Sequence, residues 1–387
     1  MGAALSRPAR GAQSAAAAAK GKGRGAARGA GKGMGKGAGK RAPQGAAASD
    51  RPSAMLRAYG LRPNKRLGQH FLVDTTYLTQ IVDAAELAPD DTVLEVGPGL
   101  GVLTEALCER AGRVVAVEID PAMRTILGNR LGTRANLGIV AADILKVDPV
   151  ALLDEGRDGP AELLEGGAAD GSAHAAPAAA DDAALPAGQP HFGPLRPHYK
   201  VVANLPYYIT SAVLRRLLEA RERPVRAVVM VQKEVADRIT ASPGDLSVLA
   251  VAIQLHAAVR RVAVVPPGAF HPPPKVESAV LCLDLYDRPP VPVDDIGSFF
   301  RVVRAGFGQK RKQLKNSLAA GLDVADAEAV RALAEAGIDP TRRAQTLTLL
   351  EWSALTAAFT AAGHVRPLRT AEADAAPSAL DRNADWT

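Results

Sequence analysis

One short stretch, Thr92–Gly101, constrains the fold of this chain more than any other. It reads Thr-Val-Leu-Glu-Val-Gly-Pro-Gly-Leu-Gly, an apolar run that opens into a glycine-rich turn. The apolar residues of the next segment, Val102–Leu107, recur at helical spacing. This pattern predicts a strand, a tight turn and a helix. Glycines in such a turn let a ligand approach the backbone closely, so we expect a ligand site there.

A second apolar run, Val114–Val117, ends at Glu118, about twenty residues after the turn, where an acid is placed to accept hydrogen bonds from ribose hydroxyls. The turn is G-x-G-x-G rather than the dinucleotide pattern G-x-G-x-x-G, and Glu95 precedes it. A carboxylate there repels a pyrophosphate but suits a ligand that carries an ammonium. These features favour S-adenosylmethionine (SAM), and E-x-G-x-G-x-G resembles the motif of class I methyltransferases.

Two later strand patterns also end in polar residues. Leu137–Ala141 precedes Asp143, whose carboxylate can accept a hydrogen bond from the adenine amine of SAM. Lys200–Ala203 precedes Asn204, whose side-chain oxygen can hold a target adenine N6 together with the backbone carbonyl just after it. The carboxyl ends of such strands meet beside the cofactor in a doubly wound sheet.

The residues that follow Asn204 complete a candidate catalytic group. Pro206 removes a competing N–H and stiffens the loop, and Tyr207 offers a face on which a base can stack. The proline-rich stretch Pro266–Val276 predicts a rigid loop, in which Phe270 either plugs the core or forms the second face of an adenine sandwich. The candidate catalytic residues are Asn204, Leu205, Pro206, Tyr207 and Phe270.

Past Pro289-Pro290 the pattern becomes all-helical. We expect a helix over Gln309–Leu318 that carries four positive charges. A run of charges is often only a solvated face, but here it accompanies a site suited to RNA, which favours phosphate contact. The candidate RNA-binding residues are Lys310, Arg311, Lys312 and Lys315.

Composition divides the chain into four parts. Residues 1–54 are expected to be a disordered Gly/Ala/Lys/Arg tail; the first fifty hold ten Lys and Arg and one Asp. This tail either keeps the protein soluble or attaches loosely to RNA. Residues 55–290 are expected to form the methyltransferase domain, interrupted by a disordered acidic insertion at 155–197. Residues 291–365 are expected to form a helical RNA-binding domain, and 366–387 a disordered tail.

The composition also excludes some kinds of protein. The two cysteines, Cys108 and Cys282, have no metal-ligand spacing, so we expect no metal site and a reducing, cytoplasmic compartment. The chain has no apolar run long enough for a membrane span and no hydrophobic secretory signal, so no membrane partner is expected. We expect a monomer.

With these residues in hand, the chain resembles the KsgA family of small-subunit ribosomal RNA adenine dimethyltransferases from about Tyr59 to Phe359. The motifs that carry the resemblance are Gly68-Gln69-His70-Phe71-Leu72, Glu95-Val96-Gly97-Pro98-Gly99-Leu100-Gly101, Asn204-Leu205-Pro206-Tyr207, Gln232-Lys233-Glu234-Val235, Phe270 with Lys275-Val276-Glu277-Ser278, Lys310-Arg311-Lys312, Asn316-Ser317-Leu318, Gly337-Ile338-Asp339-Pro340 and Arg342-Arg343-Ala344. Family cofactor positions correspond to His70, Leu72, Gly97, Glu118, Asp143 and Asn204. Members often have Asn where His70 stands, and either a ring nitrogen or the backbone can keep that contact.

The resemblance implies an α/β protein: a class I, Rossmann-like SAM-dependent methyltransferase sheet, doubly wound, with a small all-helical C-terminal domain. It implies transfer of methyl groups from SAM to N6 of two adjacent adenosines, in a hairpin loop near the 3′ end of 16S rRNA in the 30S subunit, with a role in ribosome biogenesis. Three alternatives stay open. They are a resistance-type 23S rRNA methyltransferase, a non-catalytic RNA-binding assembly factor and a DNA adenine methyltransferase.

Overall fold

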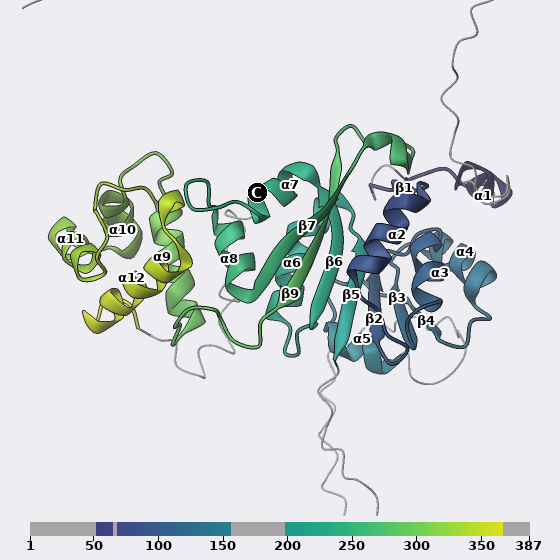
Figure 1. Cartoon of the computed structure of the whole chain (residues 1–387), viewed down its shortest axis with the longest axis horizontal. Helices are drawn as coiled ribbons and strands as arrows, with labels where there is room; N and C mark the ends of the chain where they lie inside the picture. Colours follow the sequence, from purple (N-terminus) through teal and green to yellow (C-terminus); the bar gives the residue numbers. More distant parts are fainter. Residues whose placement is uncertain (1–51, 65–67, 156–197, 367–387) are drawn as a thin grey trace, which may run out of the picture. The chain divides into compact units, whose positions relative to one another are not determined.

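The computed structural model describes residues 52–64, 68–155 and 198–366 (Figure 1). The expected basic tail, acidic insertion and C-terminal tail therefore lie almost entirely outside the described residues. Their edges need small corrections. Helix α1 begins at Pro52, not at Met55, and helix α5 runs as far as Glu155. No helix within the described ranges is both long and apolar enough to cross a membrane.

A seven-stranded sheet forms the centre, in the order β4-β3-β2-β5-β6-β9-β7. The first five strands of this order are parallel, whereas β9 runs antiparallel to both β6 and β7. The doubly wound sheet expected from the sequence is confirmed, and the antiparallel strands lie at one edge of it. The strands are β2 (Thr92–Val96), β3 (Arg113–Val117), β4 (Leu137–Val140), β5 (Tyr199–Asn204), β6 (Arg226–Gln232), β7 (Ala257–Val265) and β9 (Ser278–Leu285).

Helices cover both faces of this sheet. They are α2 (Thr75–Ala84), α3 (Val102–Cys108), α4 (Pro121–Leu131), α5 (Pro149–Glu155), α6 (Thr210–Glu219), α7 (Lys233–Ile239) and α8 (Val248–His256). Helix α1 (Pro52–Ala58) instead packs in a separate small cluster with α4. N-terminal capping explains where some of these helices begin. Asp120 accepts from the Ala122 N–H, and Pro121 occupies the first turn of α4, where its missing N–H costs nothing.

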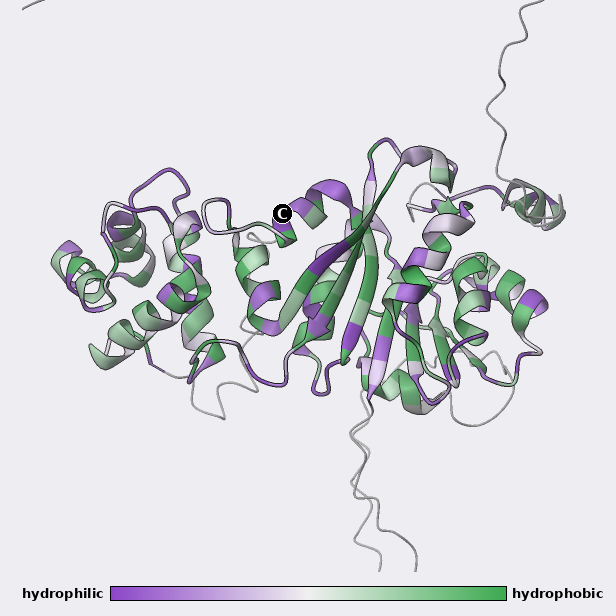
Figure 2. Cartoon of the chain, in the orientation of Figure 1, coloured by the Kyte–Doolittle hydropathy of each residue, from purple (hydrophilic) through white to green (hydrophobic). Residues whose placement is uncertain are grey.

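Strand side chains alternate between two hydrophobic layers. In β2, Val93 packs on one face and Leu94 on the other, and both are buried. Helices α2, α3 and α4 contribute to the layer of Val93, whereas α5, α6, α7 and α8 contribute to the layer of Leu94. A parallel sheet needs both faces covered because its strands are apolar on both sides. The central strands are accordingly coloured mainly as hydrophobic in Figure 2.

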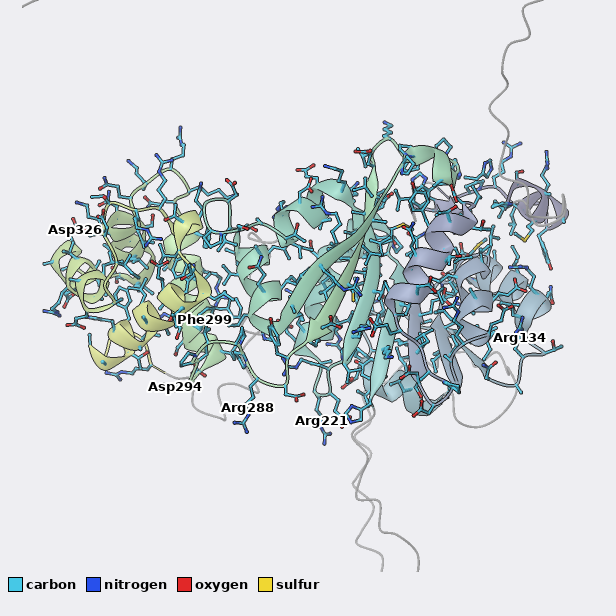
Figure 3. The ribbon with its side chains drawn as sticks, in the orientation of Figure 1. Arg134, Arg221, Arg288, Asp294, Phe299 and Asp326 are labelled. Carbon is cyan, nitrogen blue, oxygen red and sulfur yellow. The ribbon has the colours of Figure 1, made fainter. Side chains whose placement is uncertain are left out.

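Four helices follow the sheet, as expected for an all-helical C-terminal part. They are α9 (Ile296–Phe307), α10 (Leu314–Leu322), α11 (Asp326–Glu335) and α12 (Leu349–Ala361). Their core is continuous with the layer beside the sheet: the His256 ring at the end of α8 stacks on Phe300 of α9, with ring centroids 6.3 Å apart. Phe299 lies in this interior, whereas Asp326 lies at the outer surface (Figure 3).

The expected helix over Gln309–Leu318 is wrong in its first half. Lys310, Arg311 and Lys312 lie in the turn between α9 and α10, and α10 begins only at Leu314. The Leu314 side chain is buried and its N–H donates to the Arg342 carbonyl at 2.7 Å. Cations are disfavoured at a helix N-terminus, which carries partial positive charge, so three in a row suit the turn better.

The proline-rich stretch, expected to be a rigid loop, also contains regular secondary structure. It contains a 3₁₀ turn, η4 (Pro267–Ala269), and a short strand, β8 (Phe270–His271). This strand pairs antiparallel with β1 (Phe71–Leu72), which lies far from it in sequence. A pair of two-residue strands has no periodicity that a sequence pattern can reveal.

The packing of α9 against α10 gives a stability test. A Cβ added at Gly321 would lie 2.6 Å from Ala305 Cα, a backbone atom that cannot move aside cheaply. We expect Gly321→Ala to lower the free energy of unfolding by about 1–3 kcal/mol, the usual cost of overpacking. The matched control is Gly128→Ala in α4, where a Cβ meets nothing within 4 Å. Alanine there should stabilise by about 0.5–1 kcal/mol through its higher helix propensity. Denaturant titration measures both, and equal effects of the two substitutions would contradict this packing.

Candidate active site

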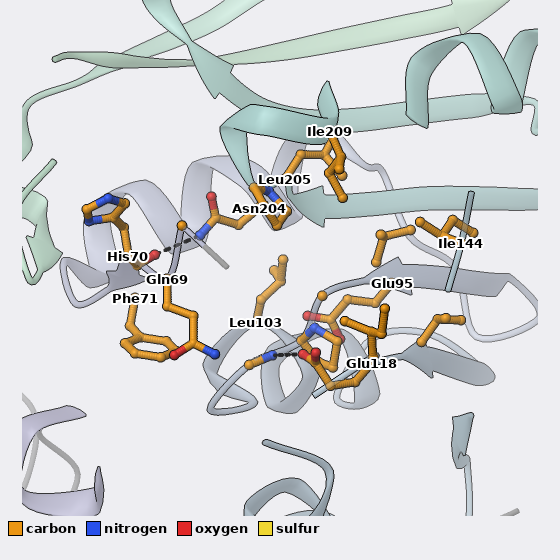
Figure 4. Close-up of a pocket in the computed structure, with 18 of the residues that line it drawn as sticks. Gln69, His70, Phe71, Glu95, Leu103, Glu118, Ile144, Asn204, Leu205 and Ile209 are labelled. Atoms are coloured by element: carbon orange, nitrogen blue, oxygen red, sulfur yellow. Dashed lines mark hydrogen bonds between the residues drawn. The ribbon is translucent and has the colours of Figure 1, made fainter. Parts of the chain in front are cut away.

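A pocket of about 360 Å³ opens at the carboxyl ends of β2, β3, β4 and β5 (Figure 4). It collects residues from six separate segments: the stretch before and within β1, helix α2, the end of β2 with the glycine-rich turn and the start of α3, and the ends of β3, β4 and β5. The sequence-predicted residues that line it are His70, Leu72, Gly97, Glu118, Asp143, Asn204, Leu205, Pro206 and Tyr207. The parallel strands thus bring together side chains that lie far apart along the chain.

The glycine turn forms the wall nearest β2. Gly99 has a φ of +55°, which side-chain-bearing residues rarely adopt. A Cβ at this position would also lie 3.1 Å from the ring of Phe71, so the turn and the β1 segment approach each other closely. Only glycine permits both this backbone conformation and this close approach.

Glu118 is held in a fixed position at the end of β3. Its two carboxylate oxygens accept from the Gly99 N–H at 3.2 Å and the Asp120 N–H at 2.9 Å. The side chain is only 7% exposed, and this burial raises its pKa above the usual value despite the two N–H donors. A pocket-lining acid with both oxygens oriented by backbone is preorganised to accept further hydrogen bonds from a ligand.

Glu95 is the most constrained acid of the pocket. It is 1% exposed, and its Oε2 has no hydrogen-bond partner among the described residues. Burial, and to a lesser degree the nearby Glu118, raises its pKa to about 8. A buried acceptor without a partner is costly, so a cationic group that entered the pocket would be stabilised here. This observation shows that the residues present fit a ligand that carries an ammonium.

Asp143 and Leu72 lie on two other walls. Asp143 Oδ1 accepts from the Leu145 N–H at 3.0 Å, which fixes the carboxylate just after β4, and Lys146 lies 3.9 Å from Oδ2. Leu72 is a buried residue of β1 that pairs with Phe270. The pocket therefore has acids at the ends of β2 and β3 and just after β4, with apolar surface between them.

The Asn204 loop follows β5. Asn204 Nδ2 donates to the His70 carbonyl at 3.2 Å, and no described residue donates to Asn204 Oδ1. The Leu205 N–H donates to the Met230 carbonyl at 3.2 Å, which ties the loop to β6. The Pro206 carbonyl accepts from the Ile209 N–H at 3.1 Å and so closes the turn η3 (Tyr207–Ile209). The loop is fixed by its backbone, and the Asn204 oxygen is left available.

Tyr207 is held by contacts with two other segments. Its hydroxyl lies 2.6 Å from Ser278 Oγ, and its ring stacks on His70 with centroids 5.9 Å apart and planes at 22°. Burial raises the pKa of Tyr207. Its position is therefore set by β9 on one side and by the segment before β1 on the other.

Phe270 departs from the catalytic group expected from the sequence. It is 4% exposed, packs in the hydrophobic layer of α2 and α3, and does not line the pocket. Its place in β8 explains this, because pairing with Leu72 directs it into the core. The geometry favours the first of the two expected roles, a plug on the core, over a stacking face for adenine.

Two polar residues of the pocket, Gln69 and Tyr208, were not among the candidate site residues. Gln69 links the β1 segment to the residues after β3: its Oε1 accepts from the Asn64 N–H and its Nε2 donates to Asp120 Oδ2 at 3.0 Å. Tyr208 lines the pocket mouth and is 60% exposed. Gln69 was part of a quoted motif, whereas nothing in the sequence distinguished Tyr208 from the adjacent Tyr207.

The basic residues of the C-terminal part form a surface. Lys310, Arg311 and Lys312 are exposed in the α9–α10 turn and form no ion pair with any described residue. Arg343 adds to them: it is exposed, and the adjacent Arg342 carbonyl bonds to the start of α10. Arg342 itself is engaged by Glu351 through both of its terminal nitrogens. We call Lys310, Arg311, Lys312, Lys315 and Arg343 the basic surface.

Comparisons with known proteins agree with this geometry. The model of a family described as ribosomal RNA adenine dimethylase matches residues 60–355. Two proteins named ribosomal RNA small subunit methyltransferase A, from Dehalococcoides mccartyi and Moorella thermoacetica, are each 42% identical to this chain. These matches cover 81% and 80% of this chain and 96% of each relative.

Solved structures show the same fold. A dimethyladenosine transferase from Plasmodium falciparum aligns with a TM-score of 0.58 at 23% identity, over 76% of this chain and 99% of that one. The 23S rRNA methyltransferase ErmE aligns with a TM-score of 0.54 at 26% identity, over 75% and 99% of the two chains.

The raised pKa of Glu95 predicts how stability depends on pH. Folded Glu95 keeps its proton up to a pKa of about 8, whereas the unfolded chain releases it near 4.5. The folded state thus binds the extra proton between these values, and the free energy of unfolding should fall as pH rises from about 5 to about 8. Glu95→Gln should flatten this dependence. Denaturant titrations across this range test it, with the exposed Glu109→Gln as control, and parallel curves for Glu95→Gln and the parent protein would contradict the assignment.

Proposed function

Because the chain belongs to the ribosomal RNA adenine dimethylase family, we propose that it dimethylates N6 of two adjacent adenosines of 16S ribosomal RNA. The observation that carries this proposal is the available Asn204 oxygen, which lines the same pocket as the oriented Glu118 and Glu95, whose Oε2 has no partner among the described residues. One pocket thus offers an acceptor for an amine that is to be methylated and acids for a cationic methyl donor.

The methyl donor is S-adenosylmethionine, which supplies an activated methyl group on a sulfonium. Each of the three acids in the pocket suits a different polar group of SAM. Glu95 suits the ammonium, Glu118 suits the ribose hydroxyls and Asp143 suits the adenine amine. Gly97 and Gly99, both with positive φ, form the turn whose backbone lines the pocket. Leu72 adds apolar surface, and His70 contributes its backbone carbonyl to the wall.

Asn204 performs the central step at the target base. The N6 lone pair of adenine is delocalised into the ring, so N6 is a poor nucleophile until it becomes tetrahedral. The Asn204 oxygen accepts one N6 hydrogen and a backbone carbonyl of the loop accepts the other, which favours the tetrahedral form. The methylated amine becomes acidic as its new bond forms, so water can take the proton. Tyr207 supports the base from the wall of the pocket.

The RNA is held by charge outside the pocket. The basic surface can neutralise phosphates without reading sequence. We place the target adenosines in a hairpin loop of 16S rRNA in the 30S subunit, because looped bases leave their stack at lower cost than paired ones. An enzyme that modifies this RNA acts in the cytoplasm during ribosome biogenesis. We propose that this protein acts as a monomer.

A 23S rRNA methyltransferase is the second candidate, because ErmE shares the fold at 26% identity. The relatives named as small-subunit methyltransferases are more similar, at 42% identity over 96% of their length. An incubation with labelled SAM separates the possibilities. Undermethylated 30S subunits, protein-free 23S rRNA and DNA are offered in parallel, and dimethyladenosine is mapped. We expect two adjacent dimethyladenosines in 16S rRNA alone. Methylation of 23S rRNA or DNA instead, or SAM binding without any transfer, would overturn the proposal.

The role of Asn204 predicts a specific kinetic defect. Its contact with N6 strengthens as the nitrogen becomes tetrahedral, so it acts mainly in the transition state. Asn204→Ala should slow single-turnover methylation by about 10²–10³-fold, the usual effect of losing one preorganised hydrogen bond. Affinity for RNA should change little. Rates are compared with SAM and RNA both saturating, and an unchanged rate would remove Asn204 from the catalytic centre.

The basic surface predicts a change in salt dependence. Arg311→Gln should weaken RNA binding and make the plot of log affinity against log salt shallower by about 0.7–0.9, the value for one lost phosphate contact. The control is a substitution far from the basic surface, Arg134→Gln; Figure 3 shows Arg134 at the opposite side of the sheet from α9–α12, and it pairs with Glu105 and Glu109. The control should keep the parent slope. Filter binding across a salt series gives both slopes, and equal slopes for Arg311→Gln and the parent would exclude Arg311 from the RNA contact.

A further inference from the structure

His70 is tethered on both sides at the pocket wall. Its ring nitrogen Nδ1 lies 2.8 Å from the Pro272 carbonyl oxygen. A carbonyl only accepts, so Nδ1 carries the proton and donates it. The backbone carbonyl of His70 in turn accepts from Asn204 Nδ2 at 3.2 Å. Figure 4 shows the imidazole directed away from Glu118 and the carbonyl directed towards Asn204.

The His70 carbonyl determines the orientation of the Asn204 amide, and therefore which of its two ends can contact the substrate. An amide has a donor end and an acceptor end, and only the donor end satisfies a carbonyl. A flipped amide would place two oxygens against each other at 3.2 Å. The contact therefore leaves Oδ1, the atom that must accept from N6, without a partner among the described residues.

The imidazole also fixes the neighbouring aromatic ring. It stacks on Tyr207, whose hydroxyl is held by Ser278 at 2.6 Å. The segment that follows His70 is bonded to β8 through Phe71 and Leu72. One histidine thus joins the Pro272 segment, the Tyr207 ring and the Asn204 amide, whereas its ring forms no hydrogen bond or ion pair with Glu95, Glu118 or Asp143.

We propose that His70 is a positioning residue for methyl transfer: its imidazole anchors the backbone carbonyl that orients the Asn204 amide. This inference rests on the proposed function of Asn204 and goes beyond it. It also differs from one of the two possibilities left open by the sequence, that a ring nitrogen of His70 contacts SAM. A side chain that acts through Asn204 should affect the rate of transfer, and one that contacts SAM should affect SAM affinity.

His70→Phe tests the proposal, because phenylalanine keeps a ring to stack on Tyr207 but cannot donate to Pro272. We expect single-turnover methylation, with SAM and RNA saturating, to slow by about tenfold to a hundredfold, the range for a small misplacement of a reacting group. The SAM dissociation constant, measured by calorimetry, should stay within about twofold of the parent value, because SAM-facing groups are untouched. His70→Asn, which restores an N–H donor, should recover most of the rate.

The matched control is His271→Phe, on β8 in the same small sheet, whose ring forms no hydrogen bond with the described residues. It should leave the rate unchanged. A double-mutant cycle guards against a general structural defect. In the Asn204→Ala background His70→Phe should cost almost nothing further, because the group it positions is gone.

Three results would overturn the proposal: an unchanged rate in His70→Phe, a SAM affinity weakened by about tenfold with a normal rate at saturation, or equal effects of His70→Phe in both backgrounds. The proposed function fails separately. A parent protein that methylates no small-subunit RNA contradicts that function, whereas the positioning role is contradicted by the comparison between the parent and its His70 variants.

Discussion

The pocket depends above all on two buried carboxyl groups, Glu95 and Glu118, which make it favourable for a cationic ligand. Parallel pairing of β2 and β3 places their carboxyl ends side by side, and both acids follow from that register. Glu118 is oriented by two backbone N–H groups, whereas Glu95 Oε2 has no partner. Such a site is costly when empty of cations and favourable when a cation enters it. The fold thus prepares the pocket for a positively charged methyl donor.

The segment before and within β1 connects the donor side of the pocket with the target side. Gln69 bonds to Asp120 beside Glu118, and His70 bonds to Asn204 and Pro272. Neighbouring residues of one segment therefore hold the cofactor wall and the catalytic amide at the same time. The C-terminal helices share a continuous core with the helices beside the sheet. The basic surface is thus part of the same folded body as the catalytic loop.

The sequence predicted the sheet well because each strand is an apolar run that ends in a polar residue or a turn. Thr92–Val96 is a strand as expected, since the glycine turn marks its end. The prediction that Lys310 lies on a helix was wrong, because a run of charged residues is compatible with either a helix or a turn. The burial of Phe270 and the tethering of His70 depend on pairing between β1 and β8, which are too short and too distant to recognise in sequence.

The most direct test of this account is the number of protons released when SAM binds. Glu95 has a pKa of about 8 in the ligand-free protein, so it is mostly protonated at neutral pH, and an ammonium beside it favours the ionised form. Calorimetry in buffers of different ionisation enthalpy counts these protons. We expect about one proton released by the parent protein at neutral pH and almost none by Glu95→Gln. SAM binding with equal proton release in both proteins would contradict the claim that the buried Glu95 carboxyl receives the ammonium.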